Sequence, residues 1–550
     1  MNNIFKPVTG LLMVLVLICC QKAGNNSEDG MNSFNADSLR YDISILASDS
    51  FLGRKPFTLG ETRTIRFLQK RFAEAGLEPG NGESFLQDVP MAEILAVADP
   101  VMQVKSPRGT IMLNAYDDYV IWTNRTDEHI SLSNNEVVFA GYGVVAPEYN
   151  RNDYEGLDVK DKIVLVMVND PGFRTGDSTL FRGDTMTYYG RWTYKFEEAA
   201  RQGAKGCLVI HNTRAASYPF IVLQNSFNTP QLQLDQRGKN VRNCDVIGWI
   251  PEAVTKRLFE AAGYDSSLFV KANEKGFKPV PLNLRLSTSM KVRTTYNKSY
   301  NVIGKITGSK RPDEVIIYTA HWDHLGIGRP DDTGDTVYNG ALDNASAVAG
   351  LLELARAFKS MKTPPERTIV FLAVTGEEQG LLGSEYYVQN PLYPLAKTVA
   401  DINMECLNWS ERTRDMVIVG AGQSDLEDSY RNIVVNAGGY LSAEQHPEAG
   451  SFFRSDHFSF ARAGVPALYP VTGTDIEDRG KAYGAEIQND YNSMNYHRPS
   501  DEFSDSTWIM DGALMELKYV FQLGKQLASE KEFPGWKPGS EFGSLRTGEN

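Results

Sequence analysis

The feature of the sequence that most constrains its fold is an alternation of apolar and amphipathic segments from residue 282 onward. The apolar segments EVIIYTA (314–320), RTIVFLAV (367–374) and KTVADINM (397–404) have the length and composition of buried β-strands. Between the first two lies NASAVAGLLELARAFKSM (344–361), an amphipathic helix that ends before a pair of prolines. Strands and helices that alternate in this way predict an α/β fold with a mostly parallel sheet flanked by helices.

A second pattern occupies residues 128–281. The segments EVVFAGYGVVAP (136–147) and GLDVKDKIVLVMVND (156–170) are β-like, and FEEAARQGAKGCLVIHN (196–212) is typical of a helix, a glycine stop and a buried strand. A chain of 550 residues is also too long for one ordinary core. We therefore predict at least two domains, with residues 128–281 as a compact α/β unit, and a C-terminal tail of little order over 531–550.

The N-terminus has the pattern of an export signal. Lys6 precedes an apolar run, residues 8–18, which is too short to cross a bilayer as a helix but suits a signal peptide. The string before Cys20 resembles a bacterial lipobox. We therefore predict a signal peptide over 1–20, lipidation of Cys20 and a polar linker over 21–33. The protein would be an exported lipoprotein, periplasmic or associated with the outer membrane, and only the lipid anchor would touch the membrane. Plain secretion with cleavage nearby is the alternative.

Composition excludes some classes of function. A formal net charge of −13 argues against nucleic-acid binding, which normally requires a basic surface. The three cysteines after the signal segment, Cys207, Cys244 and Cys406, are too few for a disulfide framework and lack the close spacing of a structural zinc site. We expect them to be buried as small hydrophobic residues. The sequence gives no indication of the oligomeric state.

Histidine and carboxylate side chains follow the predicted strands of the larger domain. Five of the seven histidines lie between residues 321 and 497. His321 comes directly after the first strand, Glu377 and Glu378 lie just beyond the second, and Glu405 follows the third. Because the carboxyl ends of parallel strands meet at one edge of a sheet, these side chains are predicted to converge there. This mixture of residue types favours a metal site.

Other acidic and imidazole groups accompany this set. Asp323 follows His321 by two residues and could accept the second ring N–H of a metal-bound histidine. Asp343, in NGALDNAS, stands at a turn into a helix, where an ordinary N-cap is an equal alternative. Two further motifs pair such groups with their neighbours: Asp456 with His457 in RSDH, and Tyr496 with His497 in NYHRPSDEF.

The ordered set of motifs resembles peptidase family M28, a family of zinc peptidases that includes bacterial aminopeptidases. The family pattern of His, G-A-x-D-N, E-E-x-G-L-x-G-S, I-N-x-D, S-D-H and Y-H is followed in order, and the resemblance covers residues 34–125 and 282–527. The segment between them resembles a protease-associated domain through the strings FAGYGV and GLDVKDKIVLV. The resemblance therefore implies a larger catalytic domain over residues 34–127 and 282–530, with a smaller α/β domain inserted over 128–281.

The resemblance implies two zinc ions per chain, bridged by the two carboxylate oxygens of Asp343. His321 and Glu405 would complete one metal site, and Glu378 and His497 the other. A water between the ions would be the nucleophile, and the unbound neighbour Glu377 would be its general base.

The remaining motif residues would support this site. The resemblance implies that Tyr496 can stabilise the oxyanion, whereas Asp323, Asp456 and His457 would position ligands or substrate. It also implies a cis peptide bond between Asp343 and its neighbour. The chain departs from the family at Glu405, where the pattern usually has aspartate, so the reach of that ligand differs.

We therefore expect a metallo-exopeptidase acting on peptides, most simply an aminopeptidase that releases N-terminal residues. Carboxypeptidase or glutaminyl cyclase chemistry on the same fold remains open. A binding protein that has lost catalysis is a further alternative, although such a protein would be expected to have lost more ligands.

Overall fold

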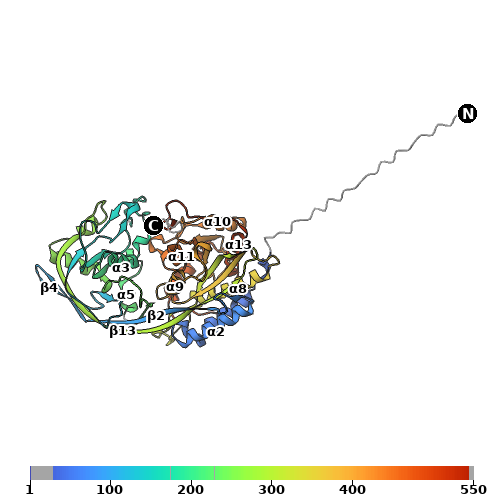
Figure 1. The fold of residues 1–550 in the computed structure, drawn as a ribbon, viewed down its shortest axis with the longest axis horizontal. Helices are drawn as coiled ribbons and strands as arrows, with labels where there is room; N and C mark the ends of the chain where they lie inside the picture. The colour runs from blue at the N-terminus through green and yellow to red at the C-terminus, as the bar shows by residue number, and fades with distance from the viewer. Residues whose placement is uncertain (2–28, 174, 228, 544–550) are drawn as a thin grey trace.

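The computed structural model describes residues 1, 29–173, 175–227 and 229–543, and its fold is drawn in Figure 1. The predicted signal peptide and Cys20 lie outside the described residues. Within the described part of the chain, no helix combines the length and apolar character needed to cross a membrane.

The larger unit is built on a mostly parallel sheet, as the sequence predicts. Its strands are β21 (Ala467–Leu468), β18 (Thr398–Asn403), β14 (Arg311–His321) and β17 (Arg367–Val374), which lie in this order and run parallel. The last part of β13 (Val280–Ile306) adds an antiparallel strand beside β17. The fold-class prediction, an α/β fold with helices flanking a mostly parallel sheet, is confirmed.

Alternation along the central strands explains why helices cover both faces. In β14, Ile316 and Tyr318 belong to one buried cluster and Ile317 belongs to another on the opposite face. Since successive side chains of a strand point to opposite faces, an apolar strand with both sides buried requires helices on both sides. The helices on the first face are α1 (Ala36–Leu46), α2 (Leu59–Glu74), α8 (Ala347–Ser360) and α13 (Asp511–Ser529). Those on the second face are α9 (Leu382–Gln389) and α11 (His457–Arg462).

A second unit extends from the same sheet through β13. The first part of this long strand pairs with β6, and the parallel strands β9, β10 and β12 follow, with β5 antiparallel at the edge. Helices α3 and α6 pack on opposite faces. The bounds are β6 (His129–Phe139), β9 (Ile163–Met167), β10 (Gly206–His211), β12 (Val246–Pro251), β5 (Val120–Trp122), α3 (Trp192–Arg201) and α6 (Glu252–Ala262).

Strands upstream of the predicted insertion also pack with the second unit. β2 (Leu86–Ala98) pairs with β13 along its length, and β3 (Val101–Ser106) and β4 (Gly109–Asn114) form a hairpin on the same strand. Their side chains, such as Val104 and Leu113, join the second core. The sequence assigned these residues to the larger domain. In the structure they pack in the core of the second unit, because β3 pairs with the distant strand β13.

The remaining elements are short or peripheral. The helices are α4 (Thr213–Ala216), α5 (Phe220–Ser226), α7 (Ser267–Lys271), α10 (Leu426–Asn436) and α12 (Gly480–Met494). The strands are β1 (Glu78–Pro79), β7 (Val145–Ala146), β8 (Arg151–Asn152), β11 (Gln231–Leu234), β15 (Gly326–Ile327), β16 (Val337–Tyr338), β19 (Asp415–Ile418), β20 (Tyr440–Ser442) and β22 (Pro470–Thr472).

The C-terminal segment joins the two units. Trp536 donates its indole N–H to the carbonyl of Gly464 at 3.2 Å, and Phe542 is buried in the second-face core. Glu541 accepts the backbone N–H of Tyr188, in the second unit, at 3.1 Å. The expectation of little order is therefore wrong for residues 531–543, because two aromatic side chains anchor a segment whose composition is otherwise polar.

Candidate metal and active site

Asp343 occupies the centre of the candidate site. Its Oδ1 lies 3.2 Å from Nε2 of His321, and its Oδ2 lies 3.2 Å from Nε2 of His497. The alternative, an ordinary N-cap, is wrong, because α8 begins after Ser346 and Asp343 lies outside its first turn. The peptide bond between Asp343 and Asn344 is cis, as the family resemblance implies.

One group of ligand-type atoms lies on the Oδ1 side of Asp343. His321 ends β14, so its imidazole stands at the carboxyl edge of the sheet. Its Nε2 lies 3.9 Å from Oε1 of Glu405 and 3.9 Å from Oε2 of Glu377. His321, Asp343 and Glu405 each offer one ligand atom within 4.8 Å of the others.

A second group lies on the Oδ2 side. Oε2 of Glu378 is 3.2 Å from Nε2 of His497, the same distance that separates His497 from Asp343. His324 also belongs here, because its Nδ1 lies 2.6 Å from Oε1 of Glu378. His324, Asp343 and Glu378 offer atoms within 4.8 Å of one another. His324 was not among the predicted ligands, although it stands in the same HWDHLG motif as His321.

Spacing and unsatisfied atoms show that these groups fit a metal ion. Two ligand atoms bound tetrahedrally to one zinc ion would lie roughly 3.3–3.6 Å apart, since zinc–ligand bonds to nitrogen and oxygen are about 2.0–2.2 Å. The observed separations of 3.2–3.9 Å bracket that range. Within the described residues, Nε2 of His321, Oδ1 of Asp343 and Nε2 of His324 are buried without a hydrogen-bond partner. Such atoms are costly unless something else binds them.

The charges of these clustered side chains also favour a bound cation. Burial raises the pKa of Glu377 well above its usual range, and it raises the pKa of Glu405 to about 7. Burial alone would lower the pKa of His321, but Glu377 and the neighbouring carboxylates raise it well above its usual value. Several carboxylates packed together out of water therefore require compensating positive charge, which a bound cation supplies.

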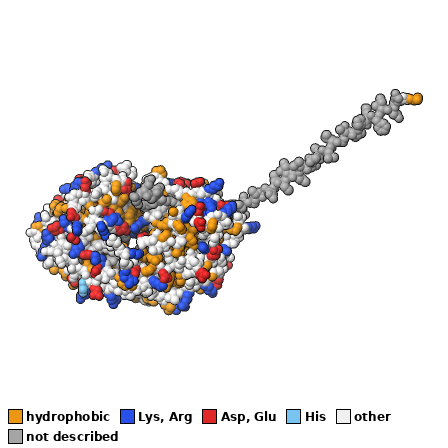
Figure 2. Space-filling view, viewed as in Figure 1, with side chains coloured by type: hydrophobic (Ala, Val, Ile, Leu, Met, Phe, Trp, Pro, Cys, Tyr) orange, Lys and Arg blue, Asp and Glu red, His pale blue; other side chains and the backbone are white. Residues whose placement is uncertain are grey.

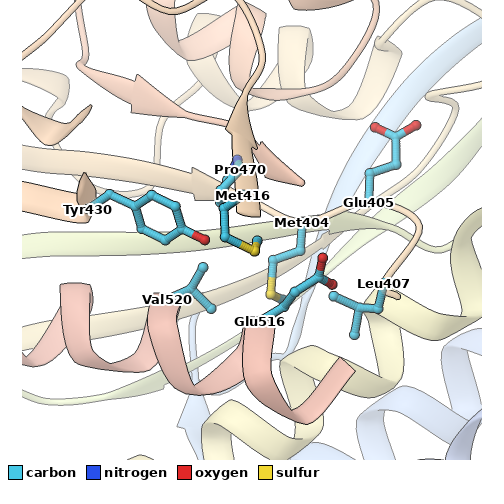
Figure 3. A pocket seen from close by; sticks show the side chains of 8 residues that line it. All are labelled: Met404, Glu405, Leu407, Met416, Tyr430, Pro470, Glu516 and Val520. Atoms are coloured by element: carbon cyan, nitrogen blue, oxygen red, sulfur yellow. The ribbon is translucent and has the colours of Figure 1, made fainter. Parts of the chain in front are cut away.

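Glu405 reaches toward this site despite its extra methylene. Its Oε2 accepts a short hydrogen bond from the hydroxyl of Ser455, and its Oε1 faces His321. Glu405 borders a cavity of about 10 Å³ that Tyr430 and Glu516 also line. Figure 3 shows its carboxylate pointing away from the other lining side chains. The contacts with His321 and Ser455 place that carboxylate among the ligand-type groups.

Two of the predicted supporting residues are buried carboxylates beside the ligand groups. Asp323 accepts the backbone N–H of Glu377 at 3.1 Å through Oδ1. Nδ1 of His321 is closer to the backbone oxygen of Asp323, at 3.1 Å, than to its carboxylate, at 3.9 Å. Asp456 accepts the hydroxyl of Ser384 at 2.6 Å, and burial raises its pKa to about 6.

The other two supporting residues lie differently. His457 packs between the rings of Phe452 and Tyr469, at centroid distances of 4.6 and 5.0 Å, and burial lowers its pKa to about 3. It therefore packs as an aromatic ring beside the site. Tyr496 is 44% exposed, and its ring stacks on the imidazole of His497 at 3.9 Å.

Two further residues hold the loop that carries Asp343. Asp501 accepts the backbone N–H groups of Leu342 and Asp343 at 3.0 and 3.1 Å. Arg54 is buried and donates to the backbone oxygens of Leu46, Trp322, Asn339 and Gly340. Asp501 stands in the NYHRPSDEF motif, so a signal for it was present. Three of the four partners of Arg54 lie more than 260 residues away along the chain, and nothing in the sequence marks it.

Comparison with known proteins agrees with this geometry. Residues 301–520 match the family model described as Peptidase family M28. A probable zinc metalloprotease of Pyrenophora teres f. teres is 39% identical over 110 residues, which is 20% of this chain and 23% of that protein. Aminopeptidase YwaD of Bacillus subtilis is 27% identical over 343 residues, which is 60% of this chain and 58% of that protein. The chain thus spans less than two thirds of the length of these curated relatives.

A solved structure extends the likeness to the whole fold. The aminopeptidase from Aneurinibacillus sp. strain AM-1 superposes with a TM-score of 0.50 at 18% identity, covering 94% of this chain and 97% of that one. At this identity the likeness concerns the fold alone. Residues 301–520, which contain every residue of the two ligand groups, belong by this match to peptidase family M28.

Proposed function

We propose that the protein is a zinc-dependent aminopeptidase that binds two metal ions per chain. The observation that carries this proposal is the position of Asp343, whose two carboxylate oxygens each face a different histidine at 3.2 Å. A carboxylate that serves two imidazoles on opposite sides supports two adjacent metal positions that share one ligand. If only one metal ion were bound, the ligand-type residues on one side of Asp343 would have no metal to bind.

The donor set supports zinc. Imidazole nitrogen and carboxylate oxygen are common zinc ligands, and two of the similar proteins are named as probable zinc metalloproteases. His321 and Glu405 would hold one ion, Glu378 and His497 the other, and Asp343 both. Bound zinc would lower the pKa of a coordinated water and polarise the carbonyl of the scissile bond.

Glu377 is placed to move the proton. Its Oε2 lies 3.9 Å from Nε2 of His321, and Asp323 fixes its backbone through a hydrogen bond of 3.1 Å. A carboxylate at this position can accept a proton from the attacking water and pass it to the leaving amino group. The adjacent Glu378 faces the other way, toward His497, so the pair divides into one base and one ligand.

Metal content and substrate choice test the proposal. Elemental analysis of purified protein is expected to show two zinc ions per chain, and a chelator should abolish hydrolysis until zinc is restored. Free dipeptides should be cleaved, whereas N-acetylated dipeptides should not. A maximum of one metal ion after zinc addition would contradict the dinuclear site. Cleavage of only the acetylated peptides would show a carboxypeptidase, and cyclisation of N-terminal glutamine without peptide hydrolysis would show a cyclase.

We also propose that the protein is exported and anchored through lipidated Cys20. The lipobox-like sequence supports this proposal. Cells expressing the full chain should incorporate labelled fatty acid into the protein, and Cys20→Ser should abolish the label. Equal labelling of the wild-type and Cys20→Ser proteins would exclude this cysteine as the site.

A further inference from the structure

His324 is a buried imidazole beside the ligand group on the Oδ2 side of Asp343. It follows β14 by three residues and is 1% exposed, whereas the side chain of His497 is 36% exposed. Histidine is scarce on the face of the molecule drawn in Figure 2. Burying an imidazole is costly unless its nitrogen atoms are bound, so the contacts of His324 indicate its role.

Nδ1 of His324 makes the single hydrogen bond of this ring among the residues that the structure describes. It lies 2.6 Å from Oε1 of Glu378, and Nε2 is buried without a partner. An ionised carboxylate can only accept hydrogen bonds, so the proton between these two atoms belongs to the ring nitrogen. His324 therefore donates a hydrogen bond to Glu378.

The length of this contact distinguishes it from the metal-type contacts around it. Two ligand atoms of a tetrahedral zinc ion lie roughly 3.3–3.6 Å apart. Nε2 of His497 lies 3.2 Å from Oδ2 of Asp343 and 3.2 Å from Oε2 of Glu378, which is close to that spacing. The 2.6 Å between His324 and Glu378 is instead the length of a short hydrogen bond. Nδ1 of His324 and Oε1 of Glu378 are thus too close to bind the same ion.

The two oxygens of Glu378 consequently have different partners. Oε1 accepts the hydrogen bond from His324, and Oε2 faces His497. A carboxylate with one oxygen held in this way presents only the other oxygen to a metal ion. Hydrogen bonds from neighbouring side chains orient ligating carboxylates and tune metal affinity.

The backbone of Gly340 packs against the ring of His324. A Cβ atom at Gly340 would lie 2.5 Å from Cγ and 2.5 Å from Cδ2 of the imidazole, so this close approach requires glycine. Arg54 donates to the backbone oxygens of Gly340 and of Trp322, two residues before His324. The same buried guanidinium therefore holds both segments that position the ring.

We propose that His324 is a positioning residue that holds Glu378 for monodentate binding of the metal ion on the Oδ2 side of Asp343. This inference rests on the proposed two-metal function. The Nδ1–H group fixes Oε1 of Glu378 and leaves Oε2 for the ion, and the imidazole itself binds no metal. Without this donor, Oε1 would be buried without a partner, and the carboxylate could rotate away from the ion. That ion should then bind more weakly, while the ion beside His321 and Glu405 keeps its ligands.

The test uses two substitutions of nearly equal shape. In His324→Asn the side-chain N–H₂ group takes the position of Nδ1, whereas His324→Leu places a methyl group there. Competition with a chelator should show one of the two zinc ions bound about 10–100-fold more weakly in His324→Leu, with the other unchanged. His324→Asn should restore most of that affinity. At limiting zinc, kcat for a free dipeptide should fall and recover in parallel, while KM stays the same.

Cobalt(II) in place of zinc separates positioning from direct ligation. The visible absorption of bound cobalt depends on the number and geometry of its ligands, so it is insensitive to a residue that is not a ligand. The cobalt spectrum of His324→Asn should match that of wild type. A changed spectrum in this variant would show that His324 is a ligand and would overturn the proposal. Better recovery in His324→Gln, whose amide nitrogen lies near the position of Nε2, would also overturn it.

His446→Leu is the matched control. Nδ1 of His446 also faces a glutamate, since it lies 3.2 Å from Oε1 of Glu448, but the His446 side chain is 76% exposed. This variant should retain wild-type zinc affinity and turnover. Thermal unfolding of each metal-free variant checks folding. If His324→Leu does not fold, the comparison of His324→Asn with His324→Gln remains as the test.

The outcomes distinguish this inference from the function on which it rests. Equal zinc affinity in wild type and His324→Leu, equal weakening of both zinc ions, or no recovery in His324→Asn would refute the positioning role alone. Wild type that binds fewer than two zinc ions, or that hydrolyses no dipeptide, would refute the proposed function and the inference with it.

Discussion

Replacing Asp501 by asparagine tests how the structure holds its central ligand. Asp501 accepts three hydrogen bonds: two buried ones from the backbone N–H groups of Leu342 and Asp343, and a partly buried one from the hydroxyl of Tyr491 at 3.2 Å. The residue is only 2% exposed. It therefore fixes the backbone on either side of the Leu342–Asp343 peptide bond, and thereby aims the carboxylate of Asp343 toward both histidines.

The magnitude follows from the number of donors that lose their acceptor. Asparagine keeps one acceptor oxygen and places an N–H₂ group where the second oxygen was, so about two of three bonds are lost. Hydrogen bonds to a charged group contribute about 1.5–3 kcal/mol each, which gives roughly 3–6 kcal/mol. Burial raises the pKa of Asp501, which weakens the charged form, so the lower end applies. A loss of about 3 kcal/mol corresponds to a fall in Tm of roughly 6–12 °C for a large domain.

Two measurements check Asp501→Asn. Thermal unfolding of the metal-free protein should show the fall in Tm, and competition with a chelator should show zinc affinity reduced by about 10–100-fold, as for residues that orient ligands. Asp505→Asn is the control, because Asp505 lies on the same segment but its side chain is 82% exposed. Wild-type stability together with wild-type zinc affinity in Asp501→Asn would refute the reasoning.

Three further predictions concern single carboxylates. Glu377→Gln should lower kcat by about 10²–10⁴-fold with zinc content unchanged, and loss of zinc together with activity would mean that the roles of Glu377 and Glu378 are reversed. Glu405→Ala should weaken the binding of one zinc ion by at least about 100-fold, and Glu405→Asp should retain activity. Unchanged zinc binding in Glu405→Ala would show that Glu405 is not a ligand. Burial raises the pKa of Glu516 from 4.5 to about 8, so the folded state favours the protonated form. Ionisation of Glu516 should therefore lower the free energy of unfolding by about 1.4 kcal/mol for each pH unit between pH 4.5 and 8. Denaturant titrations of Glu516→Gln should lack this component, and an unchanged pH profile would contradict the assignment.

The sequence by itself determined the type of fold and most of the ligand-type residues. Apolar runs such as 367–374 are readable because burial on both faces of a strand leaves a continuous hydrophobic segment. His321 and Glu405 were readable because they directly follow such strands, whose carboxyl ends meet at one edge of the sheet. These features depend on residues that are close together in the sequence, so they can be read without knowing the fold.

The tertiary structure alone decided which distant groups meet. Arg54 donates to backbone oxygens of Trp322, Asn339 and Gly340, and the residues next to it in sequence do not indicate these partners. Strands β3 and β4 join the second unit because they pair with β13, which lies far downstream. Arg462 of α11 and Glu197 of α3 belong to different units, and only the packing of these two helices brings them together. Pairing over such separations depends on the whole fold, because hydrogen bonds and charges act between neighbours in space whatever their distance in sequence.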